Sequence, residues 1–132
     1  MKKIVLKVFL ITIISLCYAA CADKTEDNKA EFHMISGEEA KKMMDEKSGY
    51  LIIDVRRIDE YESGHISNAI NIPNEVIGEE AEEKLKDKDQ LLLIYCRSGR
   101  RSKEAAQKLV DLGYTNVYEF GGILDWTYGI EN

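Results

Sequence analysis

The chain has 132 residues, 45% of them hydrophobic, which is enough for one folded domain and short for two. Its 18 basic and 24 acidic residues give a net charge of −6. Three lysines and no acidic residue precede Cys21, so the chain after Cys21 has 15 basic and 24 acidic residues and a net charge of −9. Neither nucleic acid nor an anionic membrane surface is expected as a partner of so acidic a chain.

The N-terminal residues have the pattern of an export signal. Lys2, Lys3 and Lys7 precede an uncharged and mostly apolar run over residues 8–22. This run is short for a helix that crosses a bilayer, and it matches the apolar region of a secretory signal peptide. The same shortness disfavours an uncleaved N-terminal anchor, so we expect the protein to be exported.

The sequence CYAAC at the end of this run resembles a bacterial lipobox, in which the cysteine is acylated and becomes the mature N-terminus. Tyr18 stands where that motif usually has leucine, so cleavage by the ordinary signal peptidase after Ala20 or Ala22 stays open. We expect residues 1–20 to be the signal peptide, with cleavage before Cys21 and lipidation of its side chain. The expected location is the bacterial cell envelope, as a periplasmic protein or as a lipoprotein that meets the membrane only through its N-terminal lipid.

Residues 21–31 are polar and lack apolar periodicity, which predicts a flexible tether. The folded domain is expected over residues 32–132. It begins with a helix, because Ser36 and Glu39 have the spacing of a capping box and Gly49 is a natural C-terminal stop.

Alternating strand and helix patterns follow along the chain. Three continuous apolar runs and one weaker run predict strands at 50–55, 69–73, 91–95 and 116–120. Helical patterns lie between them at 74–87 and 102–113. This alternation predicts an α/β fold, a mainly parallel sheet with helices on both faces.

The cysteines point to one loop. Cys17 and Cys21 belong to the N-terminal segment, so Cys96 is the one thiol of the folded region and no internal disulfide is possible. Such a cysteine is either an inert buried side chain or a functional one. Cys96 follows the strand at 91–95, and Ser102 is expected to cap the next helix, which places the loop where open α/β sheets bind ligands.

The residues around Cys96 favour a negative charge. Backbone amides at a helix N-terminus carry the positive end of the helix dipole. Together with nearby cations they lower the pKa of a cysteine thiol from about 8.5 to between about 3.5 and 7.5. Arg97, Arg100 and Arg101 supply the cations, and Gly99 is expected to adopt the positive φ that a tight loop of converging amides needs.

Three separated motifs carry a resemblance to a known family. CRSGRRS at 96–102, LIIDVRRIDEYESGHISNAINIP at 51–73 and GGILDW at 121–126 resemble the rhodanese family of sulfurtransferases, in the same order along the chain. The similarity runs from about Ile35 to Trp126. It implies a single rhodanese domain with an open parallel five-stranded sheet and helices on both faces.

The resemblance also implies roles for the loop residues. Cys96 is the nucleophile that forms a persulfide, and Arg97 and Arg101 are the preferred anion contacts. The amides and side chains that cradle the sulfur species belong to Arg97, Ser98, Gly99, Arg100 and Arg101.

Three further residues are expected to support the loop. Asp54 ends its strand and Arg56 follows it, so the pair is expected to brace the loop from the neighbouring strand end; the alternative is that it only satisfies loop backbone. Ser102 supports the loop from the next helix. By resemblance, His65 is a structural turn residue and not a general base.

The chemistry implied is a two-step exchange. The Cys96 thiolate attacks the outer sulfur of a small anionic donor such as thiosulfate, sulfite departs, and a thiol or cyanide then accepts the sulfur from the persulfide. The resemblance implies no metal and no organic cofactor, because the cysteine itself carries the sulfur. A single domain on a tether is expected to be a monomer.

Two other functions stay open. Phosphatases and arsenate reductases of the same fold have five residues between cysteine and arginine, whereas here the fifth residue after Cys96 is Arg101 and the next is Ser102. This shorter loop favours sulfur transfer. The second alternative is a rhodanese module that carries or binds sulfur with little turnover.

Overall fold

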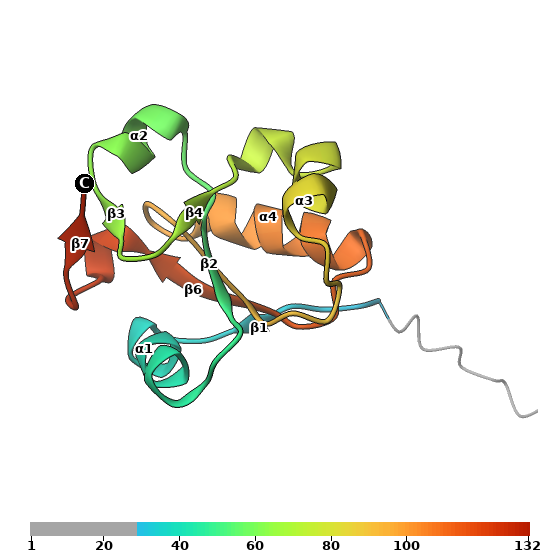
Figure 1. Ribbon diagram of the computed structural model, residues 1–132, viewed down its shortest axis with the longest axis horizontal. Coiled ribbons are helices and arrows are strands. Elements are labelled where there is room, and N and C mark those ends of the chain that lie inside the picture. Colours follow the sequence, from blue (N-terminus) through green and yellow to red (C-terminus); the bar gives the residue numbers. More distant parts are fainter. Residues whose placement is uncertain (1–28) are drawn as a thin grey trace, which may run out of the picture.

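The computed structural model of the chain describes residues 29–132. The predicted signal peptide at 1–20 and the predicted lipidation site Cys21 lie outside the described residues. Five parallel strands form the central sheet in the order β1-β6-β5-β2-β4 (Figure 1). Their bounds are β1 His33–Met34, β2 Leu51–Asp54, β4 Ile70–Asn71, β5 Leu92–Cys96 and β6 Val117–Gly122.

Helices cover both faces of this sheet, as the sequence predicts (Figure 1). Helix α1 packs on one face, and α3 and α4 pack on the other. The helices are α1 Gly37–Glu46, α2 Ile58–Glu62, α3 Glu79–Lys84 and α4 Arg100–Asp111, with short 3-10 turns at η1 Asn74–Val76 and η2 Ile123–Asp125. Within residues 29–132, none of these helices has the length and apolar character to span a bilayer.

Local signals predict the start of α1 correctly. The backbone N–H of Ser36 donates to Glu39 Oε2 at 2.7 Å, and the backbone N–H of Glu39 donates to Ser36 Oγ at 3.1 Å. Both halves of the capping box are therefore formed, and they satisfy two of the amide groups that a helix N-terminus leaves without partners.

Other elements differ from the sequence prediction. The single helix predicted at 74–87 is split into η1 and α3, and Gly78, a poor helix former, stands between them. Strand β1 has only two exposed residues and so carries no apolar signal. A second, two-stranded antiparallel sheet joins β3 His65–Ile66 to β7 Ile130–Glu131, which are too short to show a period.

The alternation of side chains along β5 decides on which face Cys96 lies. Ile94 and Cys96 belong to the core beneath α3 and α4, whereas Leu93 and Tyr95 belong to the core beneath α1. All five residues of the strand are buried. Cys96 is therefore the last residue of a fully buried strand, at its carboxyl end and on the α4 face.

A buried ion pair ties the strand ends together on the α1 face. Arg56 Nη2 donates to Asp54 Oδ2 at 2.7 Å and to the carbonyl oxygen of Gly64 at 2.6 Å. The Tyr95 hydroxyl donates to Asp54 Oδ2 at 2.7 Å and accepts from the backbone N–H of Ile66 at 3.0 Å. Burial, with the nearby Asp54 carboxylate, raises the pKa of Tyr95, so its hydroxyl stays a donor. Since Tyr95 precedes Cys96, this network holds the strand end from which the loop departs.

Replacing Asp54 with alanine is expected to lower the free energy of unfolding by about 3–5 kcal/mol, because it leaves the buried Arg56 guanidinium without its carboxylate. Urea unfolding followed by circular dichroism measures the loss. Asp59→Ala is the matched control, because Asp59 pairs with Arg57 at the same sequence separation but on the surface. The control should leave the urea midpoint nearly unchanged; equal losses in the two variants would contradict a bracing role for the buried pair.

Candidate active site

The loop between β5 and α4 turns directly beneath the Cys96 sulfur. Helix α4 begins at Arg100, and the residue before it is Gly99, with φ of 110°. This confirms the positive φ expected at Gly99, which only glycine adopts without strain. In this conformation the backbone N–H of Gly99 points at Cys96 Sγ, with an N···S distance of 3.0 Å.

The predicted helix cap at Ser102 is wrong. Ser102 is the third residue of α4, fully buried, and its hydroxyl points back into the loop. Its Oγ lies 2.9 Å from the carbonyl oxygen of Gly99 and 3.4 Å from Cys96 Sγ. A serine before a helical pattern predicts an N-terminal cap. Here the residue before the helix is Gly99, so α4 begins at Arg100 and already includes Ser102.

These contacts favour the thiolate of Cys96. Burial raises the pKa of the thiol, since the residue is only 1% exposed. Hydrogen bonds from the Ser102 side chain and from the backbone amides of Ser102, Gly99 and Ser98 act against burial and outweigh it, so the net pKa is lowered. The sequence argument for a thiol over converging amides therefore has a structural basis.

Arg101 is held by an acidic residue that the sequence argument missed. Its guanidinium donates to both carboxylate oxygens of Glu60 in α2, at 2.6 and 2.9 Å. This hydrogen bonding lowers the pKa of Glu60 to about 2, and the same contact raises the pKa of Arg101. The pair stays ionised at neutral pH, and it fixes a positive charge close enough to Cys96 to interact with the thiolate.

The other cradle residues are more open. The side chains of Arg97, Ser98 and Arg100 are exposed around the loop. They are therefore free to meet a ligand from solvent, whereas Arg101 is half-buried and already paired. The five predicted cradle residues thus span the loop and the first turn of α4, and they include one arginine held by Glu60 and two exposed arginines.

A second residue missed from sequence lies under the loop. Glu119 of β6 is 2% exposed, and its Oε1 accepts hydrogen bonds from Ser102 Oγ at 2.6 Å and from the backbone N–H of Gly121 at 2.8 Å. An acidic side chain inside a predicted strand was the available signal. Sequence alone could not tell whether it pointed to solvent or inward.

The Gly121-Gly122 pair gives the loop its close support. A side chain at Gly122 would place its Cβ 2.0 Å from the carbonyl oxygen of Arg97 and 2.6 Å from the backbone nitrogen of Ser98. The backbone of β6 therefore packs directly against the cradle. No other residue type can occupy this position without moving the loop.

His65 has structural contacts. Its ring stacks on Tyr61 with the centroids 3.8 Å apart, Nδ1 lies 3.0 Å from the Tyr61 carbonyl oxygen, and Nε2 lies 3.5 Å from Glu131. These contacts join α2, β3 and β7, in keeping with the structural role expected from the resemblance.

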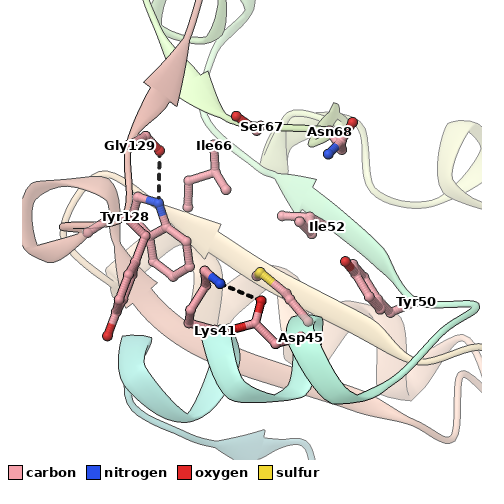
Figure 2. Close-up of a pocket in the computed structure, with 11 residues that line it drawn as sticks. Lys41, Asp45, Tyr50, Ile52, Ile66, Ser67, Asn68, Tyr128 and Gly129 are labelled. Carbon is pink, nitrogen blue, oxygen red and sulfur yellow. Dashed lines mark hydrogen bonds and ion pairs between the residues drawn. The ribbon is translucent and has the colours of Figure 1, made fainter.

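A separate cavity of about 160 Å³ opens on the α1 face of the sheet (Figure 2). Lys41 and Asp45 of α1 form an ion pair at its edge, and Ile52 and Ile66 line it from the sheet side. Cys96 is not among its lining residues, so this cavity is distinct from the thiol site. Elsewhere in the described part of the chain, no three His, Cys, Asp or Glu side chains gather to hold a metal ion.

The chain belongs to the rhodanese-like domain family, whose model matches residues 36–128. Among its relatives, the thiosulfate sulfurtransferase PspE of Escherichia coli is 38% identical over 73 residues, which cover 55% of this chain and 70% of that protein. The putative sulfur carrier protein YrkF of Bacillus subtilis is 35% identical over 106 residues, which cover 80% of this chain and 56% of that protein. The chain thus spans little more than half of the second relative.

Solved structures agree with this assignment. A structure described as rhodanese with anions, from E. coli, superposes with a TM-score of 0.59 at 34% identity, covering 63% of this chain and 98% of that chain. The five-stranded parallel sheet with helices on both faces is therefore a rhodanese fold, as the resemblance implied.

Gly122→Ala is expected to raise the pKa of Cys96, because the added Cβ displaces the Arg97 carbonyl and with it the Ser98 and Gly99 amides that face the sulfur. The pH dependence of alkylation by iodoacetamide measures this pKa. Gly37→Ala is the control, since its Cβ would meet only Trp126 at an ordinary 3.7 Å. A Gly122→Ala protein with the wild-type alkylation profile would show that the loop does not depend on this close approach.

Proposed function

We propose that the protein is a sulfurtransferase that moves sulfane sulfur from a donor such as thiosulfate to a thiol acceptor through a persulfide on Cys96. The observation that carries this proposal is the environment of Cys96 Sγ, where backbone amides and the Ser102 hydroxyl lower the thiol pKa despite burial. A thiolate is the form that attacks sulfur, so this environment prepares the side chain for sulfur exchange.

The proposed reaction has two steps. The Cys96 thiolate attacks the outer sulfur of thiosulfate, the S–S bond of the donor breaks, and sulfite leaves with the bonding electrons. An acceptor thiolate then attacks the outer sulfur of the persulfide and releases the Cys96 thiolate. The amides of the loop offer the persulfide the same hydrogen bonds that favour the thiolate. Arg101, fixed by Glu60, adds a positive charge for the anionic donor.

The names of the relatives support this function in general terms. One relative is named as a thiosulfate sulfurtransferase and one solved neighbour is described as a rhodanese with anions. The N-terminal pattern adds the proposal that transfer takes place in the cell envelope, by a monomer tethered at Cys21.

Loop geometry argues against phosphoryl chemistry. After Arg101, the next side chain is that of Ser102, which is buried and directed to Cys96 and Glu119 and not toward a ligand above the loop. The loop thus lacks the further arginine that a phosphate-binding loop of this fold would use.

A sulfur carrier with little turnover of small donors is the second candidate. It is favoured by the B. subtilis relative named as a putative sulfur carrier, which matches 80% of this chain. It is also favoured by the 1% exposure of Cys96, because a nearly closed thiol is better suited to a protein partner that opens the site than to free thiosulfate.

Treatment of the purified protein with thiosulfate is expected to add the mass of one sulfur atom, and cyanide is expected to remove it. Cys96→Ser should show no such gain, because the hydroxyl oxygen cannot form a persulfide, while its folding stays close to wild type. Intact-mass spectrometry and a thiosulfate-to-cyanide assay measure the two steps. A sulfur gain with negligible turnover would favour the carrier, and no gain from any sulfane donor would refute both functions.

Arg101→Ala is expected to raise the KM for thiosulfate about tenfold, the equivalent of about 1.4 kcal/mol, because the variant loses a fixed charge near the sulfur. Steady-state kinetics over a range of thiosulfate concentrations give this value. Arg100→Ala removes the same charge from an exposed position at the start of α4, and its KM should change less than that of Arg101→Ala. If the two variants had equal KM values, Arg101 would have no special part in donor binding.

A further inference from the structure

Two exposed apolar side chains belong to the segments that border the thiol loop. Ile58, the first residue of α2, is 55% exposed, and Leu124 in η2 is 62% exposed. Helix α2 is joined to the start of α4 by Glu60, which accepts hydrogen bonds from Arg101. At the other end of the loop, the backbone N–H of Leu124 donates to the carbonyl oxygen of Arg97 at 3.3 Å. The two apolar residues are therefore placed at opposite ends of the loop.

The charged side chains of the same region are also open to solvent. Arg97 and Arg100 are exposed, and neither takes part in the ion pairs that the structure gives for residues 29–132. Thiosulfate and cyanide are small anions, so they give a leucine or an isoleucine nothing to pack against. Apolar surface next to unpaired arginines is typical of a protein–protein interface.

We propose that four residues form a docking surface for a protein that accepts sulfur from Cys96; they are Ile58, Leu124, Arg97 and Arg100. This inference rests on the proposed function and adds the class of acceptor to it. The partner has a cysteine flanked by apolar and acidic residues. Its apolar side chains pack on Ile58 and Leu124, and its carboxylates pair with Arg97 and Arg100.

The positions of these residues favour an extended chain segment over a small thiol. A ligand that contacts both Ile58 and Leu124 spans the loop from end to end, with its centre over Cys96. Because Cys96 is only 1% exposed, an acceptor thiol has to be held close to the loop in one orientation. Contacts at both ends of the loop supply the binding energy and the orientation for this step.

The transfer needs no further reactant. The partner's thiolate forms a bond to the outer sulfur of the Cys96 persulfide. The bond between that sulfur and Cys96 Sγ breaks, and its electron pair stays on Sγ. The partner leaves with a persulfide, and Cys96 returns to the thiolate, so one S–S bond replaces another and there is no net oxidation.

Sulfur transfer to a synthetic peptide tests the docking surface. The peptide has one cysteine with glutamate and leucine on each side, and Cys96 is first loaded with sulfur from thiosulfate. We expect this peptide to take sulfur faster than free cysteine does, as followed by mass spectrometry. Peptides with serine in place of leucine, or glutamine in place of glutamate, should be slower because each loses one class of contact. A peptide no faster than free cysteine would overturn the inference.

Leu124→Ser and Ile58→Ser test the two ends of the surface. Each should lower the rate of transfer to the peptide about tenfold, the equivalent of about 1.4 kcal/mol, and leave thiosulfate-to-cyanide turnover unchanged. Met34→Ser is the matched control, because Met34 is 67% exposed on the edge strand β1 and lines a separate hollow with Phe32 and Gln107. Its two rates should equal those of wild type. If all three variants behaved alike, the surface would have no part in transfer.

Docking and sulfur transfer can fail separately. Fluorescence anisotropy with a labelled peptide whose cysteine is replaced by serine measures binding without any sulfur on Cys96. If Leu124→Ser weakened this binding in a protein that takes sulfur from no donor, the docking surface would stand and the proposed function would fail. Turnover of thiosulfate and cyanide without peptide binding would have the opposite meaning.

Sedimentation velocity tests a different occupant of the surface, a second copy of this chain. The wild-type protein is expected to sediment as a monomer. A dimer that Leu124→Ser converts to a monomer would overturn the inference, because the surface would then be covered by another copy and not by a sulfur acceptor.

Discussion

The structure of the site depends on hydrogen bonds from backbone amides to the Cys96 sulfur, at the junction of β5 and α4. Cys96 ends a fully buried strand, where burial by itself would keep its side chain a neutral thiol. The turn at Gly99 brings an N–H to 3.0 Å from the sulfur and starts the helix at the next residue. The dipoles of these backbone amides therefore offset the cost of burying a charged sulfur. They are fixed by the turn and need no further ordering when a ligand binds.

Support for this junction comes from both faces of the sheet. On the α1 face, the Asp54–Arg56 pair holds the Tyr95 hydroxyl and so fixes the end of β5. On the α4 face, β6 packs its Gly122 backbone against the loop and places Glu119 beneath it. Because Tyr95 and Cys96 are adjacent but point to opposite faces, a displacement on either side moves the strand end that carries the thiol.

Charge is distributed unevenly over the molecule. The chain after Cys21 has a net charge of −9, yet three arginines, Arg97, Arg100 and Arg101, lie in the loop and the first turn of α4 that follow Cys96. One of them, Arg101, is held by Glu60, whose carboxylate accepts hydrogen bonds from both Nη1 and Nη2. The residues that follow Cys96 therefore form a small basic region of an acidic protein, in which Arg97 and Arg100 are exposed and Arg101 is held in place.

Local sequence predicted much of the fold and singled out Cys96 as the candidate nucleophile. The apolar runs at 50–55 and 91–95, the capping box at Ser36 and the glycine turn before α4 each depend on neighbours within a few residues, so each could be predicted. The three motifs in order predicted the family. The two-residue strands could not be predicted, because they exist only through pairing with distant segments.

Tertiary structure alone decided which side chains pair with one another around Cys96. Glu60 and Arg101 are 41 residues apart, and Ser102 and Glu119 are 17 apart, so no local pattern links either pair. The start of α4 at Arg100 turned Ser102 from an expected cap into a buried link between sulfur and carboxyl. The physical reason is that periodicity and turn chemistry act between neighbours in sequence, whereas the partners of a buried charge are chosen by which strands and helices pack side by side.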